Sequence, residues 1–145
     1  MKVQDLMTSD VSCCQSGDSI QEAARVMQSL NVGSVPVCDN KKVVGIITDR
    51  DIAVQAVANG RPPTTAVTDC MSKKIVSCTP DTDAHEAADL MSQHQIRRLP
   101  VVSTTGELVG ICSIGDLATI DIHVNEAGNA LSKISQPTAS SNAVH

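Results

Sequence analysis

The chain has 145 residues, of which 41% are hydrophobic and 19% charged, the balance of a folded globular protein rather than a disordered one. Its 16 acidic and 11 basic residues give a net charge of −5, which argues against nonspecific electrostatic binding to nucleic acid or to an anionic membrane. No Phe, Tyr or Trp is present, so a bound base must lie between aliphatic side chains and backbone, without aromatic stacking.

The apolar runs are a few residues long, far below the roughly 20 residues needed to cross a bilayer. The N-terminus MKVQDLMTSD has no apolar signal region. The sequence therefore predicts a cytoplasmic protein with no membrane span.

The sequence repeats itself at a shift of 64 residues, from VQDLM at Val3 to VTDCM at Val67. At the same shift EAARVM, which begins at Glu22, meets EAADLM, which begins at Glu86. GIITDRD (45–51) meets GICSIGD (110–116) after one extra residue. We therefore expect a first copy over 1–60, a linker over 61–66 that contains two prolines, and a second copy over 67–122.

The first copy predicts a short strand, a helix, two strands and a second helix. Ser19 and Glu22 have the spacing of a helix-capping box. The apolar stripe of the helix that follows is Ile20, Ala23, Ala24, Met27 and Leu30. Strands are expected over 35–37 and 43–48 around a polar turn, and a helix from Asp49 or Asp51 that ends at Gly60.

The second copy predicts the same order of elements. Asp83 and Glu86 take the capping positions, and strands are expected over 99–102 and 108–113. The stripe of its first helix is Ala84, Ala87, Ala88 and Met91. A further amphipathic helix is expected over 123–135 and a loose polar tail over 136–145. An apolar period that starts at Leu117 and continues with Ile120 and Val124 makes a candidate seam between subunits.

Each copy carries a hydroxyl residue and an aspartate three positions later, Thr48 with Asp51 and Ser113 with Asp116. At the junction of a strand and a helix these side chains either cap the helix or hold a ligand, and the spacing alone fits both. Arg97 and Arg98 occur only in the second copy. They could clamp a phosphate through forked hydrogen bonds or form a solvated surface pair.

Other kinds of chemistry have little support in the sequence. The four histidines show no metal-ligand spacing and the six cysteines form no C-x-x-C pair, so no metal site is expected. No catalytic motif is recognisable, so we expect no enzyme. A thiol redox sensor based on Cys13, Cys14 or Cys38 remains an alternative.

The paired GIITDRD and GICSIGD elements, the VGSVPV and IRRLPV strands and the two EAA helices resemble a CBS-domain pair, also called a Bateman module. The resemblance covers residues 1 to about 122. It implies an α+β fold of two β-α-β-β-α repeats related by a pseudo-twofold axis. It also implies a bound adenosine-containing ligand, with AMP, ADP or ATP favoured over S-adenosylmethionine and NAD.

Family sites are composite, and the resemblance carries two of them over to this sequence. One combines Val32, Gly33 and Ser34 with Arg97, Arg98, Ser113 and Asp116. The other combines Thr79, Ala84 and Ile96 with Ser34, Thr48, Arg50 and Asp51. The arginine pair favours the first site for a phosphorylated ligand.

The resemblance implies a regulatory sensor that forms a homodimer and acts on an unidentified protein effector. The alternative, besides the redox sensor, is a homodimeric protein-interaction module with empty clefts.

Overall fold

The computed structural model describes residues 1–118 and residue 134. It divides into two compact units, which are described one at a time. The first unit contains Asp10–Ile75 and Thr104–Leu108, and the second contains Met1–Ser9, Val76–Ser103 and residues 109–118. The helix predicted over 123–135 and the tail predicted over 136–145 lie outside the described residues, apart from residue 134.

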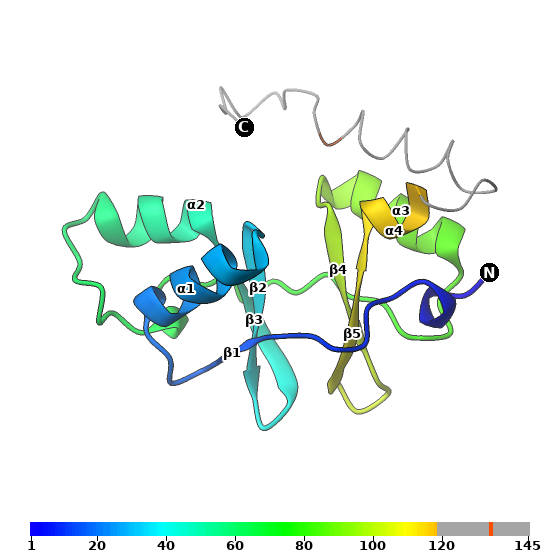
Figure 1. Cartoon of the computed structure of the whole chain (residues 1–145), viewed down its shortest axis with the longest axis horizontal. Helices are drawn as coiled ribbons and strands as arrows, with labels where there is room; N and C mark the ends of the chain where they lie inside the picture. Colours follow the sequence, from blue (N-terminus) through cyan, green and yellow to red (C-terminus); the bar gives the residue numbers. More distant parts are fainter. Residues whose placement is uncertain (119–133, 135–145) are drawn as a thin grey trace. The chain divides into compact units, whose positions relative to one another are not determined.

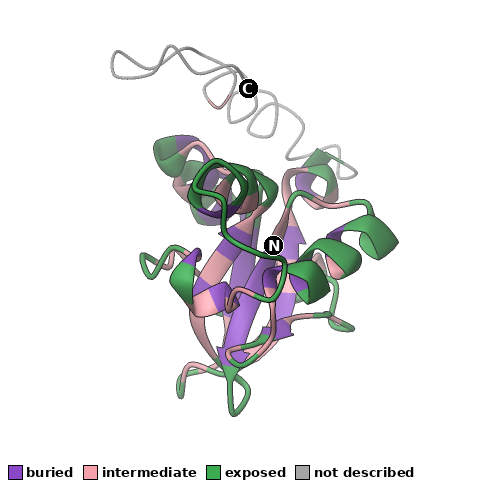
Figure 2. Ribbon diagram, turned by 90° about the vertical axis from the view of Figure 1, so that its left-hand side faces the viewer, coloured by how far each residue is buried: buried purple, intermediate pink, exposed green. Residues whose placement is uncertain are grey.

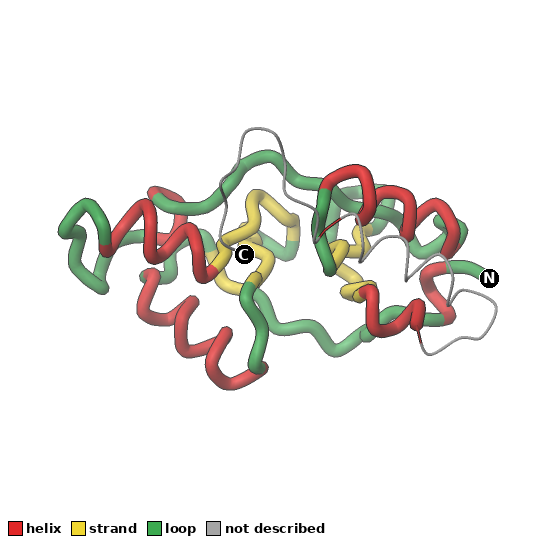
Figure 3. Tube along the Cα trace, turned by 90° about the horizontal axis from the view of Figure 1, so that it is seen from above, coloured by secondary structure: helices red, strands yellow, loops and turns green. Residues whose placement is uncertain are grey.

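The first unit is a three-stranded sheet with its helices on one side (Figures 1 and 3). Its strands are β1 (Cys14–Gln15), β2 (Ser34–Asp39) and β3 (Lys42–Thr48), in that spatial order. β1 runs parallel to β2, and β2 runs antiparallel to β3. The register pairs Ser34 with Thr48 at one end of the hairpin, which brings two predicted site residues side by side.

The helices of the first unit are α1 (Ile20–Leu30), α2 (Asp49–Asp51), the π-helical segment η2 (Ile52–Val57) and the 3-10 turn η3 (Val67–Asp69). The capping box of α1 is confirmed, because the N–H of Glu22 donates to Ser19 Oγ at 3.2 Å and the N–H of Ser19 donates to Glu22 Oε2 at 3.2 Å. The second helix starts at Asp49 and its last helical residue is Val57, ahead of Gly60, which has φ +70°.

The core of the first unit joins both helices to the sheet (Figure 2). From the predicted stripe of α1, Ile20, Ala23 and Met27 are buried. The prediction was wrong for Ala24 and for Leu30, which is 47% exposed, because the buried face of α1 is narrower than the apolar stripe of its sequence. The other fully packed members are Cys14, Val35, Val37, Ile47, Ala56, Val67 and Cys70.

The second unit repeats this plan with two regular strands, β4 (Arg98–Val102) and β5 (Leu108–Ser113). A parallel bridge between Cys78 and Val101 takes the place of the β1–β2 pairing. The helices are the 3-10 turn η1 (Val3–Asp5), α3 (Ala84–His94) and α4 (Ile114–Ala118). Asp83 caps α3 by accepting from the N–H of His85 at 2.8 Å. The predicted α+β class is confirmed.

Leu117 corrects one expectation about the subunit seam. Its side chain is fully buried and belongs to the core of the second unit, together with Ala84, Met91 and Leu99. It is therefore not available to a partner subunit, because it packs within its own unit. Ile120 and Val124 lie outside the described residues.

The boundaries of the compact units differ from those of the sequence copies, because the first residues of each copy belong to the other unit. Met1–Ser9 opens the first copy but packs in the second unit, where Thr8 pairs with Ile111. The segment from Val67 to Ile75 opens the second copy but packs in the first unit, where Ser72 pairs with Ile46. Each leading segment therefore completes the sheet and core of the other copy.

No helix among residues 1–118 is both long enough and apolar enough to span a membrane.

Candidate functional site

The junction between β3 and α2 places the hydroxyl and the carboxylate of the first copy against each other. The N–H of Asp51 donates to Thr48 Oγ1 at 3.0 Å, and the N–H of Thr48 donates to Asp51 Oδ2 at 3.0 Å. Both residues are half-buried. The predicted helix cap is thus confirmed: the pair forms a reciprocal capping box.

The junction between β5 and α4 has the same geometry in the second copy. The N–H of Asp116 donates to Ser113 Oγ at 3.1 Å, and the N–H of Ser113 donates to Asp116 Oδ2 at 2.8 Å. Burial, and secondly the Asp116 carboxylate, raise the pKa of the neighbouring Cys112 thiol to about 12. The cysteine beside this junction is therefore a neutral, buried side chain at pH 7.

Capping leaves Thr48 and Asp51 of the first copy capacity for a ligand. Each box uses the hydroxyl oxygen as an acceptor and one carboxylate oxygen, Oδ2. A hydroxyl also carries a proton to donate, and an ionised carboxylate has a second oxygen with its own lone pairs. The cap fixes the orientation of both groups before a ligand arrives.

The two junctions share a backbone frame but differ in the charges placed on it. The N–H of Asp49 donates to the carbonyl of Gly33 at 2.9 Å, and the N–H of Ile114 donates to the carbonyl of Arg97 at 2.9 Å. The first junction thus pairs a glycine with an aspartate, and the second pairs an arginine with an isoleucine.

The Asp49 carboxylate fills the space that a side chain at Gly33 would need. Its Oδ2 lies 3.1 Å from the position that a Cβ on Gly33 would take. Its Oδ1 accepts from the N–H of Arg50 at 2.8 Å. The prediction from sequence missed Asp49 because it looked for features shared by both copies, whereas the aligned residue of the second copy is Ile114.

The remaining predicted residues fall into two groups. Val32 and Ser34 flank Gly33, which bonds to the first junction, and Arg50 lies within that junction; Ile96 and Arg98 flank Arg97, which bonds to the second. Val32 and Ile96 pack against the cores of their units, while Arg97 and Arg98 are exposed.

Thr79 and Ala84 belong to the part of the second unit that precedes and opens α3. Thr79 follows Cys78, which pairs with Val101 near the far end of β4 from Arg98. Ala84 is fully buried in the core of the second unit, and its place in a ligand site stays a prediction. The grouping of residues from the two copies into composite sites stays a prediction.

Among residues 1–118 no group of three or more His, Cys, Asp or Glu side chains is placed to hold a metal ion.

The repeated strand–helix junction, with its hydroxyl and carboxylate in each copy, is matched by a known family model. The model of the CBS domain matches residues 3–56 and again residues 67–123. The chain belongs to the CBS-domain family. The resemblance stated from the sequence is therefore confirmed, including its two tandem repeats.

Relatives and solved structures agree with this assignment. CBS domain-containing protein YhcV of Bacillus subtilis is 44% identical over 133 residues, which are 92% of this chain and 94% of that protein. Hypoxic Response Protein I, solved with two coordinated zinc ions, has a TM-score of 0.73 at 30% identity and covers 82% of this chain and 98% of its own.

The CBS domain pair of protein MJ0100 was solved in complex with 5′-methylthioadenosine and S-adenosyl-L-methionine. It has a TM-score of 0.72 at 29% identity, covering 82% of this chain and 98% of its own. The CBS pair of MJ0100 thus binds two adenosine-containing molecules.

Proposed function

We propose that this protein is a regulatory module without catalytic activity of its own that binds an adenosine-containing ligand at its strand–helix junctions. The observation that carries the proposal is the pair of capped junctions, in which Thr48 with Asp51 and Ser113 with Asp116 are held in the same geometry. The ligands of the MJ0100 CBS pair support the adenosine class.

The aspartates are proposed to recognise the ribose. Two vicinal ribose hydroxyls are donors, and the carboxylates of Asp51 and Asp116 are acceptors, each oriented by the bond that its Oδ2 makes in the cap. The Thr48 or Ser113 hydroxyl is proposed to donate its proton to a ribose or phosphate oxygen. A deoxyribose ligand would lose one of these contacts, which predicts weaker binding.

The charge difference between the junctions is proposed to select the ligand. Arg97 and Arg98 beside Ser113 favour a phosphorylated ligand such as AMP, ADP or ATP, because guanidinium groups bind phosphate oxygens in pairs. In the first junction the Asp49 carboxylate lies beside Gly33, the residue that corresponds to Arg97 of the second junction, and places a negative charge there. An adenosine without phosphate, such as S-adenosylmethionine, suits that charge better.

Calorimetric melting with AMP, ATP, S-adenosylmethionine and NAD tests the proposal, since the chain has no Trp or Tyr for fluorescence. A ligand at 100 times its dissociation constant adds about 2.7 kcal/mol, which raises the melting temperature by several degrees. Asp116→Asn should abolish the rise with AMP and ATP, and Asp51→Asn the rise with S-adenosylmethionine, each compared with the ligand-free melting temperature of the same variant.

Glu22→Gln is the matched control, because it removes the carboxylate of a capping box far in sequence from both junctions. It should lower the baseline in a similar way but keep the full ligand-induced rise. If no ligand of the four raises the melting temperature, or if Asp51→Asn and Asp116→Asn respond like wild type, the proposal is wrong.

A second candidate is a homodimeric interaction module whose clefts stay empty. It is favoured by the exposed apolar side chains on the second helix of the first unit, where Val54 is 45% and Val57 is 69% exposed. Apolar groups left exposed at i and i+3 on one helix are typical of a face that a partner covers.

Sedimentation equilibrium distinguishes this candidate. Val57→Glu should convert a dimer into a monomer, whereas Gln93→Glu on exposed α3 surface should not. A wild-type protein that is monomeric at high concentration would remove the dimer from both candidates.

A further inference from the structure

Three of the six cysteines gather where β1 meets β2 in the first unit. Cys13 directly precedes β1, Cys14 opens it, and Cys38 is near the end of β2. All three are free thiols; Cys13 is half-buried, and Cys14 and Cys38 are buried. No residue of this group belongs to the proposed ligand site.

The strand register puts Cys13 and Cys38 on the same face of the sheet. Gln15 is the β1 partner of Cys38, and Cys14 is the partner of Val37. Since side chains alternate along a strand, Cys13 and Gln15 share the face of Cys38, and Cys14 points to the other face. Gln15 Nε2 lies 3.8 Å from Cys13 Sγ, which confirms that these side chains turn the same way.

The two thiols touch but differ in their access to solvent. Burial first, and then a hydrogen bond with the Cys13 side chain, raise the pKa of Cys38 to about 12. Cys38 has no exposed surface, whereas Cys13 is partly exposed. A molecule in solution therefore meets Cys13 before Cys38.

We propose that Cys13 and Cys38 are a redox-active thiol pair that a low-molecular-weight disulfide converts into an intramolecular disulfide bond. Cys13 is the attacking residue and Cys38 is the resolving residue. This site is separate from the proposed ligand junctions and does not depend on them.

The reaction has two exchange steps. The Cys13 thiolate attacks one sulfur of the small disulfide, forms a mixed disulfide and releases the first thiolate. Cys38 Sγ attacks Cys13 Sγ and passes its proton to the second thiolate as that thiolate leaves. The two protein thiols lose two electrons and two protons, and the small disulfide is reduced to two thiols.

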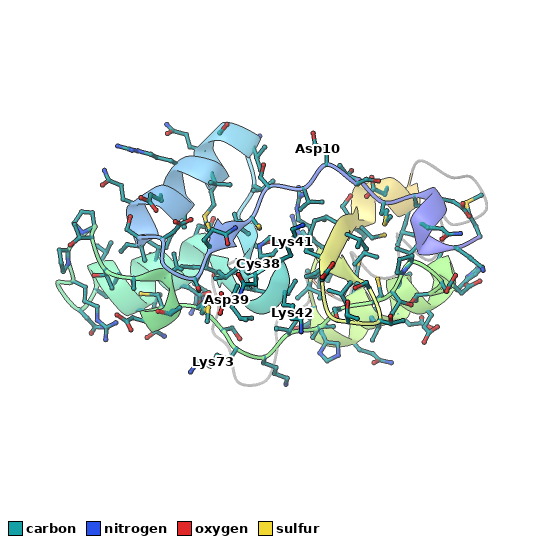
Figure 4. The ribbon with its side chains drawn as sticks, turned by 90° about the horizontal axis from the view of Figure 1, so that it is seen from below. Asp10, Cys38, Asp39, Lys41, Lys42 and Lys73 are labelled. Carbon is teal, nitrogen blue, oxygen red and sulfur yellow. The ribbon has the colours of Figure 1, made fainter. Side chains whose placement is uncertain are left out.

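The local backbone allows the bridge to form. A disulfide needs the two Cα atoms within about 7 Å, whereas diagonal neighbours on adjacent strands lie about 7–8 Å apart, so the bridge requires a small movement of the backbone at Cys13. Cys13 stands before the first residue of β1, outside the paired part of the sheet, so its backbone is free to close the last part of the gap. Figure 4 shows Cys38 next to Asp39, at the turn that carries Lys41 and Lys42.

The second copy supplies an internal comparison. At the shift of 64 residues Cys14 corresponds to Cys78, but Cys13 corresponds to Ser77 and Cys38 to Val102. The second unit thus keeps the buried strand cysteine and lacks the pair. Oxidation should be confined to the first unit.

Mass spectrometry of the folded, reduced protein after treatment with oxidised glutathione tests the proposal. Remaining thiols are alkylated, and trypsin then places Cys13 in peptide 3–25 and Cys38 in peptide 26–41. The expected product is a disulfide between these two peptides. It should persist in Cys14→Ala, which removes the neighbouring sulfur, and in the matched control Cys78→Ala.

The variants separate the two steps. Cys38→Ala should stop at one glutathione attached to Cys13, and Cys13→Ala should form neither the adduct nor the bridge. A disulfide between other cysteines would overturn the proposal, and so would the absence of the disulfide in Cys14→Ala. So would a wild-type protein whose Cys13 stays unmodified while the same protein unfolded in urea is oxidised.

Discussion

Gly45, the first residue of the GIITDRD element, lies under a close backbone crossing that allows a sharp test of the fold. A Cβ at this position would lie 2.5 Å from Met71 Sδ and 2.9 Å from the carbonyl oxygen of Ser72. Ser72 is paired with Ile46 through backbone hydrogen bonds of 3.0 and 2.9 Å. We therefore expect Gly45→Ala to push the leading segment of the second copy off β3.

The size of the effect follows from these contacts. Forcing an extra methyl group into a packed site costs about 1–3 kcal/mol, and weakening one backbone hydrogen bond costs about 1 kcal/mol more. The Met71 side chain can move aside, but the Ser72 carbonyl belongs to the backbone and cannot move alone. The expected loss in unfolding free energy is about 2–4 kcal/mol, or roughly 6–16 °C in melting temperature for a chain of this size.

Differential scanning calorimetry of Gly45→Ala and Gly17→Ala measures the effect. Gly17 is the matched control, because a Cβ there would have no neighbour within 4 Å. Gly110→Ala should behave like Gly45→Ala, since its Cβ would lie 2.7 Å from Met7 Sδ and 3.0 Å from the Thr8 carbonyl oxygen. If Gly45→Ala melts as high as Gly17→Ala, the close crossing is not a constraint and the argument is wrong.

Three further predictions concern stability. Burial, as the first cause, raises the thiol pKa from 9.0 to about 11 in Cys78 and about 12 in Cys112. These thiols ionise at lower pH in the unfolded chain than in the folded one, so their contribution to folding stability is complete below pH 9 and is lost as the pH rises towards 11 to 12. The melting temperature should therefore fall between pH 8 and pH 10, and it should fall less in Cys78→Ala than in wild type. Ser19→Ala removes the cap of α1 and should cost about 1 kcal/mol in chemical unfolding, with Ser12→Ala, outside any helix, unchanged. Leu117→Ala should cost about 2–5 kcal/mol because the side chain is fully buried; a loss below 1 kcal/mol would contradict its place in the core.

The ligand site could be predicted only in part. Recurrence at a fixed shift singled out Thr48, Asp51, Ser113 and Asp116, and the spacing of three fitted both a cap and a ligand site. The structure decides that the cap is real. It also brings Asp49 against Gly33, which no pattern shared by the copies could indicate, since the contact joins residues far apart in the sequence, just before β2 and at the start of α2, and differs between copies.

The sequence by itself determined the local and periodic features of this protein. These features are the repeat, the strands β2 to β5 and the caps at Ser19 and Asp83. They can be predicted from the sequence because each is set by residues a few positions apart or by a fixed repeat shift. Tertiary structure alone decided which segments complete which core. The leading segments exchange between the copies because VQDLM and VTDCM are nearly the same sequence, and only packing and strand pairing at a distance determine which sheet each one joins. The same long-range packing buried Leu117, exposed Ala24 and brought Cys13 to Cys38.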